Sequence, residues 1–167
     1  MEQLTGIKKL DDVLRRHASA RSRDESDDTL GELSQLAPTY IPEIRRLFDS
    51  NSYSRMSLVW CLIGQKSAEA VDLFTVAIND KNKYTRWAAA EALAKCRKAD
   101  ASLHLVNAIK DRSHLVKGTA IDAMIKFRDP TAVPQLKKIL ASSQLKQQVP
   151  GLVARAQMAL QRCEKAS

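Results

Sequence analysis

Apolar residues recur at intervals of three and four along most of the chain. Two examples are the series Ile41, Ile44, Leu47 and Phe48 and the series Leu103, Val106 and Ile109. Spacing of this kind places the apolar side chains on one face of an α-helix. Long Val/Ile/Thr-rich runs that alternate with polar residues are missing, while Ala, Leu, Lys and Glu are plentiful. The pattern therefore predicts an all-α protein.

The helical pattern recurs with a period of 31 residues. Three segments align at this spacing, and in each an acid is followed six residues later by a base: Asp49 and Arg55, Asp80 and Arg86, Asp111 and Lys117. Two residues before the base stands a large apolar side chain, which is Tyr53, Tyr84 or Leu115. A fixed period of this length indicates stacked two-helix units.

The fourth unit follows the pattern only in part. Ser142 and Gln148 stand where the acid and the base would be. The end of the unit comes late, because residues 159–166 match residues 92–99 at a separation of 67, which is five more than two periods. We therefore expect about five inserted residues, in a loop that contains Pro150 and Gly151. A terminal repeat is often atypical, since one of its sides has no neighbour.

The chain divides into five predicted helix pairs, with about ten helices in all. A divergent or capping pair occupies residues 1–37, and a flexible polar link at 19–26 joins its two helices. Four repeats follow, at 38–68, 69–101, 102–132 and 133–167. Each repeat is expected to hold a short first helix, a turn and a longer second helix.

These features carry a family resemblance. A 31-residue two-helix unit with an acid, a base six residues later and a second helix rich in Ala and Leu resembles the HEAT repeat. It is most similar to the short HEAT-like repeats of phycobilin lyases and many bacterial proteins. The resemblance covers roughly residues 38–166 and implies an α-solenoid of stacked antiparallel helix pairs, with the second helices on the concave side.

The column of acids and bases has two interpretations. The bases could form a basic row for phosphate groups. Alternatively, each base bonds the acid or the turn carbonyls of its own or the adjacent repeat, and this structural ladder is what the HEAT resemblance implies. Acid and base also disappear together in the fourth unit. We therefore predict a ladder made of Asp49, Arg55, Asp80, Arg86, Asp111 and Lys117.

Large apolar side chains lie away from the core stripe of the second helices, at about 100° of rotation per residue. They could fill the grooves between neighbouring second helices, or they could form a binding surface. The HEAT resemblance implies that these positions belong to the concave recognition face. We predict a partner-binding surface with an apolar centre of Tyr53, Met56, Trp60, Tyr84, Trp87 and Leu115. Its predicted rim consists of Lys83, His114, Asp122 and Glu91.

Charge is unevenly distributed along the chain. Residues 1–36 carry 6 Lys and Arg against 8 Asp and Glu, which gives −2, and residues 37–167 carry 21 against 11, which gives +10. The sum is the net charge of +8. An excess of base in the repeats permits binding to an acidic protein, an anionic surface or a nucleic acid, without choosing among them.

The sequence offers no convincing catalytic or metal site. The three histidines are scattered and none is adjacent to Glu, so the His-Glu pairs that hold iron in the HEAT-type deoxyhypusine hydroxylases are absent. No two Cys or His stand at the spacing of zinc ligands. We expect no cofactor and no metal. The chain begins with no apolar leader and contains no apolar run of membrane-spanning length, so we expect reduced cysteines and a cytoplasmic protein.

Three functions remain open. The first, which we favour, is a non-enzymatic scaffold or adaptor that binds a protein or peptide through the face of its second helices, with an acidic partner favoured by the basic flanks. The second is nucleic-acid binding, because HEAT-like DNA glycosylases show that such a solenoid can cradle a duplex. The third is an accessory protein of the bilin lyase kind.

Overall fold

The chain folds into a row of packed α-helices. The structure, a computed structural model, describes residues 7–166, and in that range it holds eleven α-helices, two short 3₁₀ helices and no strand. The α-helices are α1 (Lys8–Ser19), α2 (Arg23–Leu36), α3 (Ile41–Ser50), α4 (Arg55–Trp60), α5 (Ala68–Ala77), α6 (Lys83–Leu93), α7 (Lys98–Ala108), α8 (His114–Phe127), α9 (Val133–Ala141), α10 (Ser143–Gln148) and α11 (Pro150–Glu164). The 3₁₀ helices are η1 (Ala37–Thr39) and η2 (Pro130–Ala132). The predicted all-α fold is confirmed.

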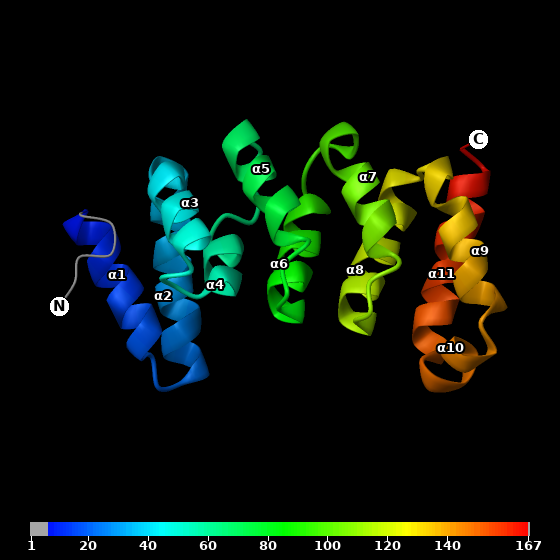
Figure 1. The fold of residues 1–167 in the computed structure, drawn as a ribbon, viewed down its shortest axis with the longest axis horizontal. Helices are drawn as coiled ribbons and strands as arrows, with labels where there is room; N and C mark the ends of the chain where they lie inside the picture. The colour runs from blue at the N-terminus through cyan, green and yellow to red at the C-terminus, as the bar shows by residue number, and fades with distance from the viewer. Residues whose placement is uncertain (1–6, 167) are drawn as a thin grey trace.

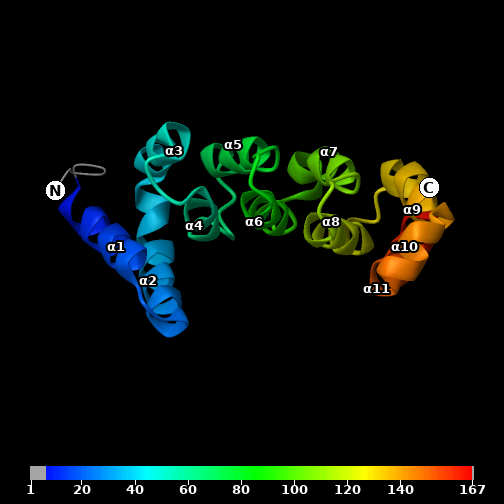
Figure 2. The ribbon, with the colours of Figure 1, turned by 60° about the horizontal axis from the view of Figure 1, so that its bottom comes forward.

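Helix pairs stand side by side from the N-terminus to the C-terminus (Figure 1). The first helices α3, α5 and α7 lie along one side of the row, and the second helices α4, α6 and α8 lie along the other (Figure 2). Helix α6 contacts both α4 and α8, and α5 contacts α7. Each pair therefore buries its apolar faces against the next pair as well as internally, which confirms the predicted solenoid.

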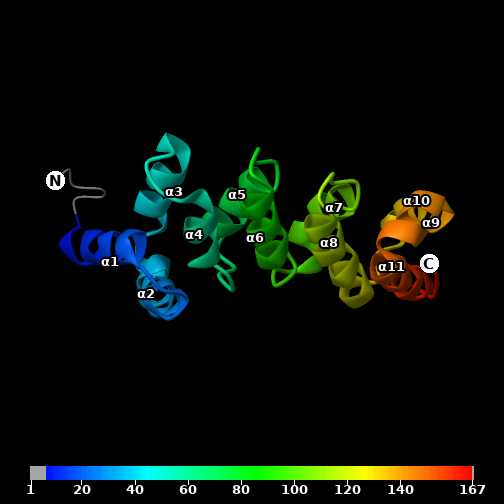
Figure 3. The ribbon, with the colours of Figure 1, turned by 90° about the horizontal axis from the view of Figure 1, so that it is seen from below.

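The row is bent toward the second helices. In Figure 2, α2 at one end and α11 at the other reach toward the side on which α4, α6 and α8 lie. The view from below shows α6 and α8 side by side along this face (Figure 3). The second helices thus line the concave side of the row.

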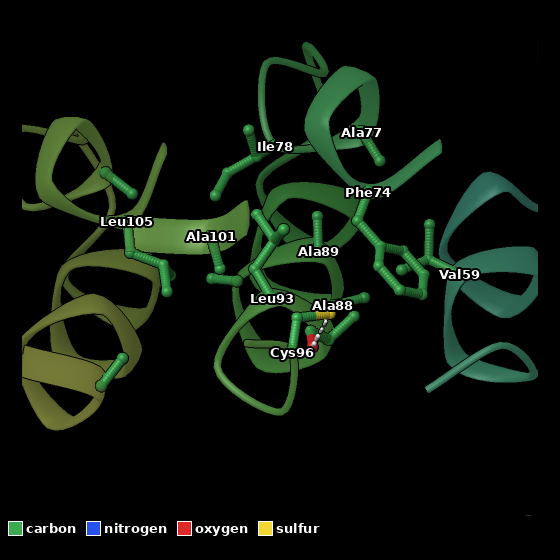
Figure 4. Close-up of a cluster of buried hydrophobic side chains, with 14 of the residues drawn as sticks. Val59, Phe74, Ala77, Ile78, Ala88, Ala89, Leu93, Cys96, Ala101 and Leu105 are labelled. Carbon is green, nitrogen blue, oxygen red and sulfur yellow. Dashed lines mark hydrogen bonds between the residues drawn. The ribbon is translucent and has the colours of Figure 1, made fainter. Parts of the chain in front are cut away.

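Small side chains allow the helices around α6 to pack closely. Its four alanines at 88, 89, 90 and 92 are completely buried. The ring of Phe74 from α5 lies between α6 and Val59 of α4, while Leu93 and Leu105 continue the core toward α7 (Figure 4). The buried residues of all the pairs form one continuous cluster, so neighbouring repeats stabilise each other.

The second helix of the first repeat is shorter than predicted. Helix α4 has 6 residues, against 10 in the preceding α3. After Trp60 the amides of Leu62 and Ile63 donate to carbonyl oxygens three residues back. The chain therefore tightens into turns, and Gly64 then adopts a left-handed φ of 97°, which glycine tolerates without strain. The prediction of a longer second helix is wrong for this repeat.

The link between α1 and α2 is also shorter than predicted, because α2 begins within the polar stretch 19–26. The Ser22 hydroxyl accepts a hydrogen bond from the backbone amide of Glu25 at 3.1 Å and so caps α2. The Glu25 carboxylate in turn accepts the amide of Arg21 at 2.8 Å. These local bonds satisfy helix-end donors, and the prediction of a loop is wrong for residues 23–26.

The insertion in the fourth repeat forms a helix of its own. The Ser142 hydroxyl accepts the amide of Leu145 at 3.3 Å and starts α10. Pro150 lies in the first turn of α11, where its missing amide hydrogen costs no helical bond. Pro150 and Gly151 therefore belong to α11 rather than to the predicted loop, and the described part of the chain holds eleven α-helices rather than about ten.

Candidate partner-binding surface

Two arginines link consecutive repeats. Arg55 Nη1 donates to Asp80 Oδ2 at 2.7 Å. Arg86 donates from Nε and Nη2 to the two carboxylate oxygens of Asp111, at 2.7 and 3.0 Å. Each aspartate stands in the turn of the repeat that follows its arginine, so the column of acids and bases runs from one repeat into the next.

The same side chains fix the shape of the turns before α6 and α8. Asp80 Oδ1 accepts a hydrogen bond from the backbone amide of Asn82. Asp111 Oδ1 accepts one from the backbone amide of Ser113, and both bonds are 2.7 Å long. Arg86 Nη1 donates to the carbonyl oxygens of Asp80 and of the residue after it, at 2.9 and 3.0 Å. Backbone and side-chain bonds together hold both turns at defined positions.

The Arg86–Asp111 pair is shielded from solvent. Its two side chains are 7% and 12% exposed. Burial by itself would raise the pKa of Asp111, but the bonds from Arg86 and from the Ser113 amide outweigh it and hold that pKa below its usual range. The bond to Asp111 likewise raises the pKa of Arg86. The carboxylate is therefore ionised and fully engaged at neutral pH, and it is not free to contact a ligand.

Two residues predicted for the ladder lie outside it. Asp49 pairs with Arg45 on its own helix at 2.9 Å, and Arg45 also reaches Asp72 of the next repeat. No base of an earlier repeat stands in the column to reach Asp49. The side-chain ammonium of Lys117 forms no hydrogen bond or ion pair with any residue in the range 7–166, because Ser142 replaces the acid that it would need.

The aromatic part of the predicted binding surface is largely packed between helices. Trp60 of α4 and Trp87 of α6 meet edge to face with ring centroids 5.1 Å apart, and both are half-buried. The Tyr53 hydroxyl donates to the carbonyl of Leu14 in α1 at 2.9 Å, and burial raises the pKa of this tyrosine. Met56 is half-buried and packs against the core. These four side chains occupy spaces between neighbouring helices.

Tyr84 and Leu115 are more exposed. They occupy equivalent positions in the first turns of α6 and α8, and 47% and 41% of their surface is accessible. The Lys83 Nζ lies 5.0 Å from the centroid of the Tyr84 ring. The exposed apolar part of the predicted surface therefore lies at the N-terminal ends of two neighbouring second helices.

A basic groove of about 590 Å³ lies at the same ends of α6 and α8. It is lined by Lys81, Lys83, Arg86, Arg112, Ser113, His114 and Leu115. Arg112 Nη2 donates to the carbonyl of Lys81 at 3.2 Å and joins the two turns that form the walls. The structure thus brings the predicted residues Lys83, His114 and Leu115 together. Tyr53 and Met56 line a separate groove of about 270 Å³ one repeat earlier.

The predicted partner-binding surface did not include Lys81 and Arg112, which the sequence offers only as bases that permit nucleic-acid binding. A signal for them exists in the sequence, because they stand 31 residues apart (112 − 81) in the turns that precede α6 and α8. Lys83 and His114 are related in the same way. Bases that share columns in neighbouring repeats are expected to meet at one edge of a solenoid.

The other features of residues 7–166 concern metal sites, cysteine reactivity and membrane-spanning helices. No group of three His, Cys, Asp or Glu side chains in this range is arranged to hold a metal ion. The three cysteines are buried and form no disulfide among the described residues, and burial raises the pKa of the Cys61 thiol to about 12. Within the same range no helix has both the length and the apolar character needed to cross a membrane.

Comparison with known protein families matches HEAT repeats at residues 37–113 and 77–149. The chain belongs to the HEAT-repeat family. The two matches overlap and together span residues 37–149, which include the ladder, the tryptophan pair and the basic groove. A HEAT-repeat protein is a helical scaffold of a type that commonly mediates protein interactions. A search among curated proteins found no match to this chain.

Proposed function

We propose that this HEAT-repeat protein is a non-catalytic scaffold that binds an acidic segment of a partner protein. The proposed site is the basic groove between the second and third repeats, with Tyr84 and Leu115 beside it. The observation that carries the proposal is the uncompensated charge of the groove. Its walls include Lys81, Lys83 and Arg112 but no acidic side chain.

The charge is uncompensated because the ladder engages the nearby acids. Asp80 and Asp111 belong to the same two turns as the groove, but they are bonded to Arg55 and Arg86. Lys81, Lys83 and Arg112 form no ion pair with any described residue. A partner carboxylate can therefore approach these bases without displacing an internal carboxylate, and opposite charge also accelerates encounter.

The groove is preorganised for binding. The Arg86–Asp111 pair, the Asp80 and Asp111 turn bonds and the contact from Arg112 to the carbonyl of Lys81 fix its two walls relative to each other. A site that is already ordered loses less conformational entropy when a ligand binds. Only the long side chains that enter the groove would have to become ordered.

Apolar anchors stand beside the charged walls. Tyr84 and Leu115 are exposed on adjacent helices, and large side chains of this kind supply much of the binding energy in protein interfaces. We therefore expect the partner segment to combine carboxylates with at least one apolar side chain. The tryptophan pair has a supporting role, since Trp87 lies one turn after Tyr84 on α6.

The concave face beyond the groove favours a protein over a nucleic acid. Glu91 of α6 accepts the hydroxyl of Thr119 at 3.0 Å, and Asp122 of α8 pairs with Arg155 at 2.8 Å. A nucleic-acid backbone laid along this face would bring its phosphates toward two carboxylates. Carboxylates therefore interrupt the basic side chains along this face, which do not form the continuous stripe that tracks a phosphate backbone.

Fluorescence anisotropy with a labelled oligo-glutamate peptide tests the proposal. The double variant Lys83→Glu/Arg112→Glu should weaken binding at least about ten-fold, since two charge contacts become repulsive. The variant Lys9→Glu/Lys165→Glu makes the same change of net charge at exposed sites on α1 and after α11, and should bind nearly as the unmodified protein does. Equal losses in the two variants would show that only net charge matters. Tighter binding of a labelled DNA duplex than of the peptide would favour nucleic acid.

A further inference from the structure

The ladder stops between the third and fourth repeats, although the end of α9 repeats a backbone hydrogen bond found after α5 and α7. The amides of Asp80 and Asp111 each donate to the carbonyl three residues earlier, at 3.1 and 3.0 Å. The amide of Ser142 does the same with Ile139 at 3.2 Å. Ser142 therefore occupies the sequence column of Asp80 and Asp111 at the end of a first helix, but it has no carboxylate and its hydroxyl caps α10.

The basic residue that would bond a carboxylate at position 142 is still present. Lys117 occupies the column of Arg55 and Arg86 and is half-buried. Lys110 and Lys138 line the same small groove of about 180 Å³, together with Gln135, Leu145 and two isoleucines. No acidic side chain lines the groove, and the ammonium groups of these three lysines make no hydrogen bond or ion pair with a residue that the structure describes. Lys110 and Lys138 are exposed, and a bound anion would relieve the mutual repulsion of the three ammonium groups.

We propose that a carboxylate from the partner protein enters this groove and completes the ladder. The bound group would sit between Lys117, Lys110 and Lys138, as the Asp111 carboxylate sits against Arg86. The inference rests on the proposed function, because the carboxylate is supplied by the same acidic partner. It adds a second contact to recognition, one repeat beyond the basic groove and on the same turn side of the solenoid, and so requires a partner segment with two separated acidic positions.

A carboxylate supplied from within the chain provides the sharpest test. Ser142→Asp keeps a residue that can cap α10 and places an acid in the ladder column. It should raise the melting temperature above that of Gln147→Glu, which makes the same charge change on exposed α10 surface outside the groove. Adding Lys117→Gln should remove the gain. If Ser142→Asp and Gln147→Glu melt alike, the ladder position is not receptive to a carboxylate and the inference fails.

Binding of labelled oligo-glutamate provides the second readout. Ser142→Asp should weaken it about five-fold by occupying the site, and Lys117→Gln should do so by removing a contact. The matched variants Gln147→Glu and Lys146→Gln should bind as the unmodified protein does. Unchanged binding in Ser142→Asp and Lys117→Gln would overturn this inference while leaving the basic groove intact, provided that Lys83→Glu/Arg112→Glu still loses affinity.

Two further outcomes separate the alternatives. If the unmodified protein binds no oligo-glutamate, the proposed function and this inference both fail. Inorganic phosphate is the control for ligand chemistry. A larger rise in melting temperature with phosphate than with oligo-glutamate at equal ionic strength, lost in Lys117→Gln, would show that the groove takes phosphate and would overturn a carboxylate ligand.

Discussion

Arg86 in α6 and Asp111 in the next repeat form a double hydrogen-bonded ion pair, with Nε–Oδ2 and Nη2–Oδ1 distances of 2.7 and 3.0 Å. The pair crosses the boundary between repeats and is almost fully buried. It therefore has two consequences. It couples the second and third repeats mechanically, and it engages the Asp111 carboxylate in hydrogen bonds within the protein.

Replacing Asp111 by Ala should destabilise the protein by about 3 kcal/mol, because Arg86 would be left buried without its counter-ion. Asp72→Ala removes an exposed carboxylate that also pairs with an arginine across repeats, and should cost at most about 1 kcal/mol. Urea unfolding followed by circular dichroism measures both. Equal losses would mean that the burial of the Arg86–Asp111 pair has no energetic effect.

The Asp111 contribution should depend on pH. The pKa of Asp111 is lowered in the folded state, so its stabilising effect is complete above the unfolded pKa of about 3.9 and is lost as the pH falls through the folded value. The difference in unfolding free energy between the unmodified protein and Asp111→Asn should therefore be constant near neutrality and should narrow below about pH 4. Chemical unfolding at a series of acidic pH values provides the measurement. If this difference in unfolding free energy became larger as the pH fell, the pKa of Asp111 could not be lowered in the folded state.

The tryptophan pair should contribute to stability. Trp87→Ala removes a half-buried ring and its edge-to-face contact with Trp60, with an expected loss of about 2 kcal/mol. Tyr84→Ala, three residues earlier and exposed, should change stability by no more than about 0.5 kcal/mol while weakening oligo-glutamate binding less than the charge reversals do. Thermal unfolding and anisotropy on the same samples separate the two roles. A stability loss in Tyr84→Ala as large as in Trp87→Ala would refute this division.

Gly118 offers a test of whether the Arg155 side chain, which lies against α8, can move. A Cβ at this position would meet the guanidinium of Arg155 at 2.9 Å, and that group ends a flexible, partly exposed side chain. Gly118→Ala should therefore be neutral or stabilising by up to about 1 kcal/mol, since alanine favours the helix. A loss of stability would show that Arg155 is held in place. Differential scanning calorimetry distinguishes these outcomes.

The sequence predicts the helices and their stacking well because both follow from local periodicity. The apolar spacing within each unit defines the helical faces, and the 31-residue period defines which units are equivalent. Local exceptions are harder to predict. The Ser22 cap, the turns after Trp60 and helix α10 depend on individual hydrogen bonds near helix ends rather than on a repeated pattern.

The candidate surface was less predictable, because it depends on contacts between repeats. A helical wheel places Trp60 and Trp87 on the same side of their helices as Tyr84, but it cannot show that the two rings meet each other. The same limit applies to Asp49 and Lys117, whose ladder partners would have to come from neighbouring units. Lys81 and Arg112 become a pair only when the turns of two repeats lie side by side.

The most direct measurement is an amide chemical-shift titration of the isotopically labelled protein with oligo-glutamate. Binding in the basic groove predicts that the largest shifts occur in the turns at residues 81–84 and 112–115, with smaller shifts near Lys117 and Leu145. The first helices α5 and α7, on the opposite side of the row, should show little change. Shifts concentrated on those helices, or on α1 and α2, would contradict the proposed site.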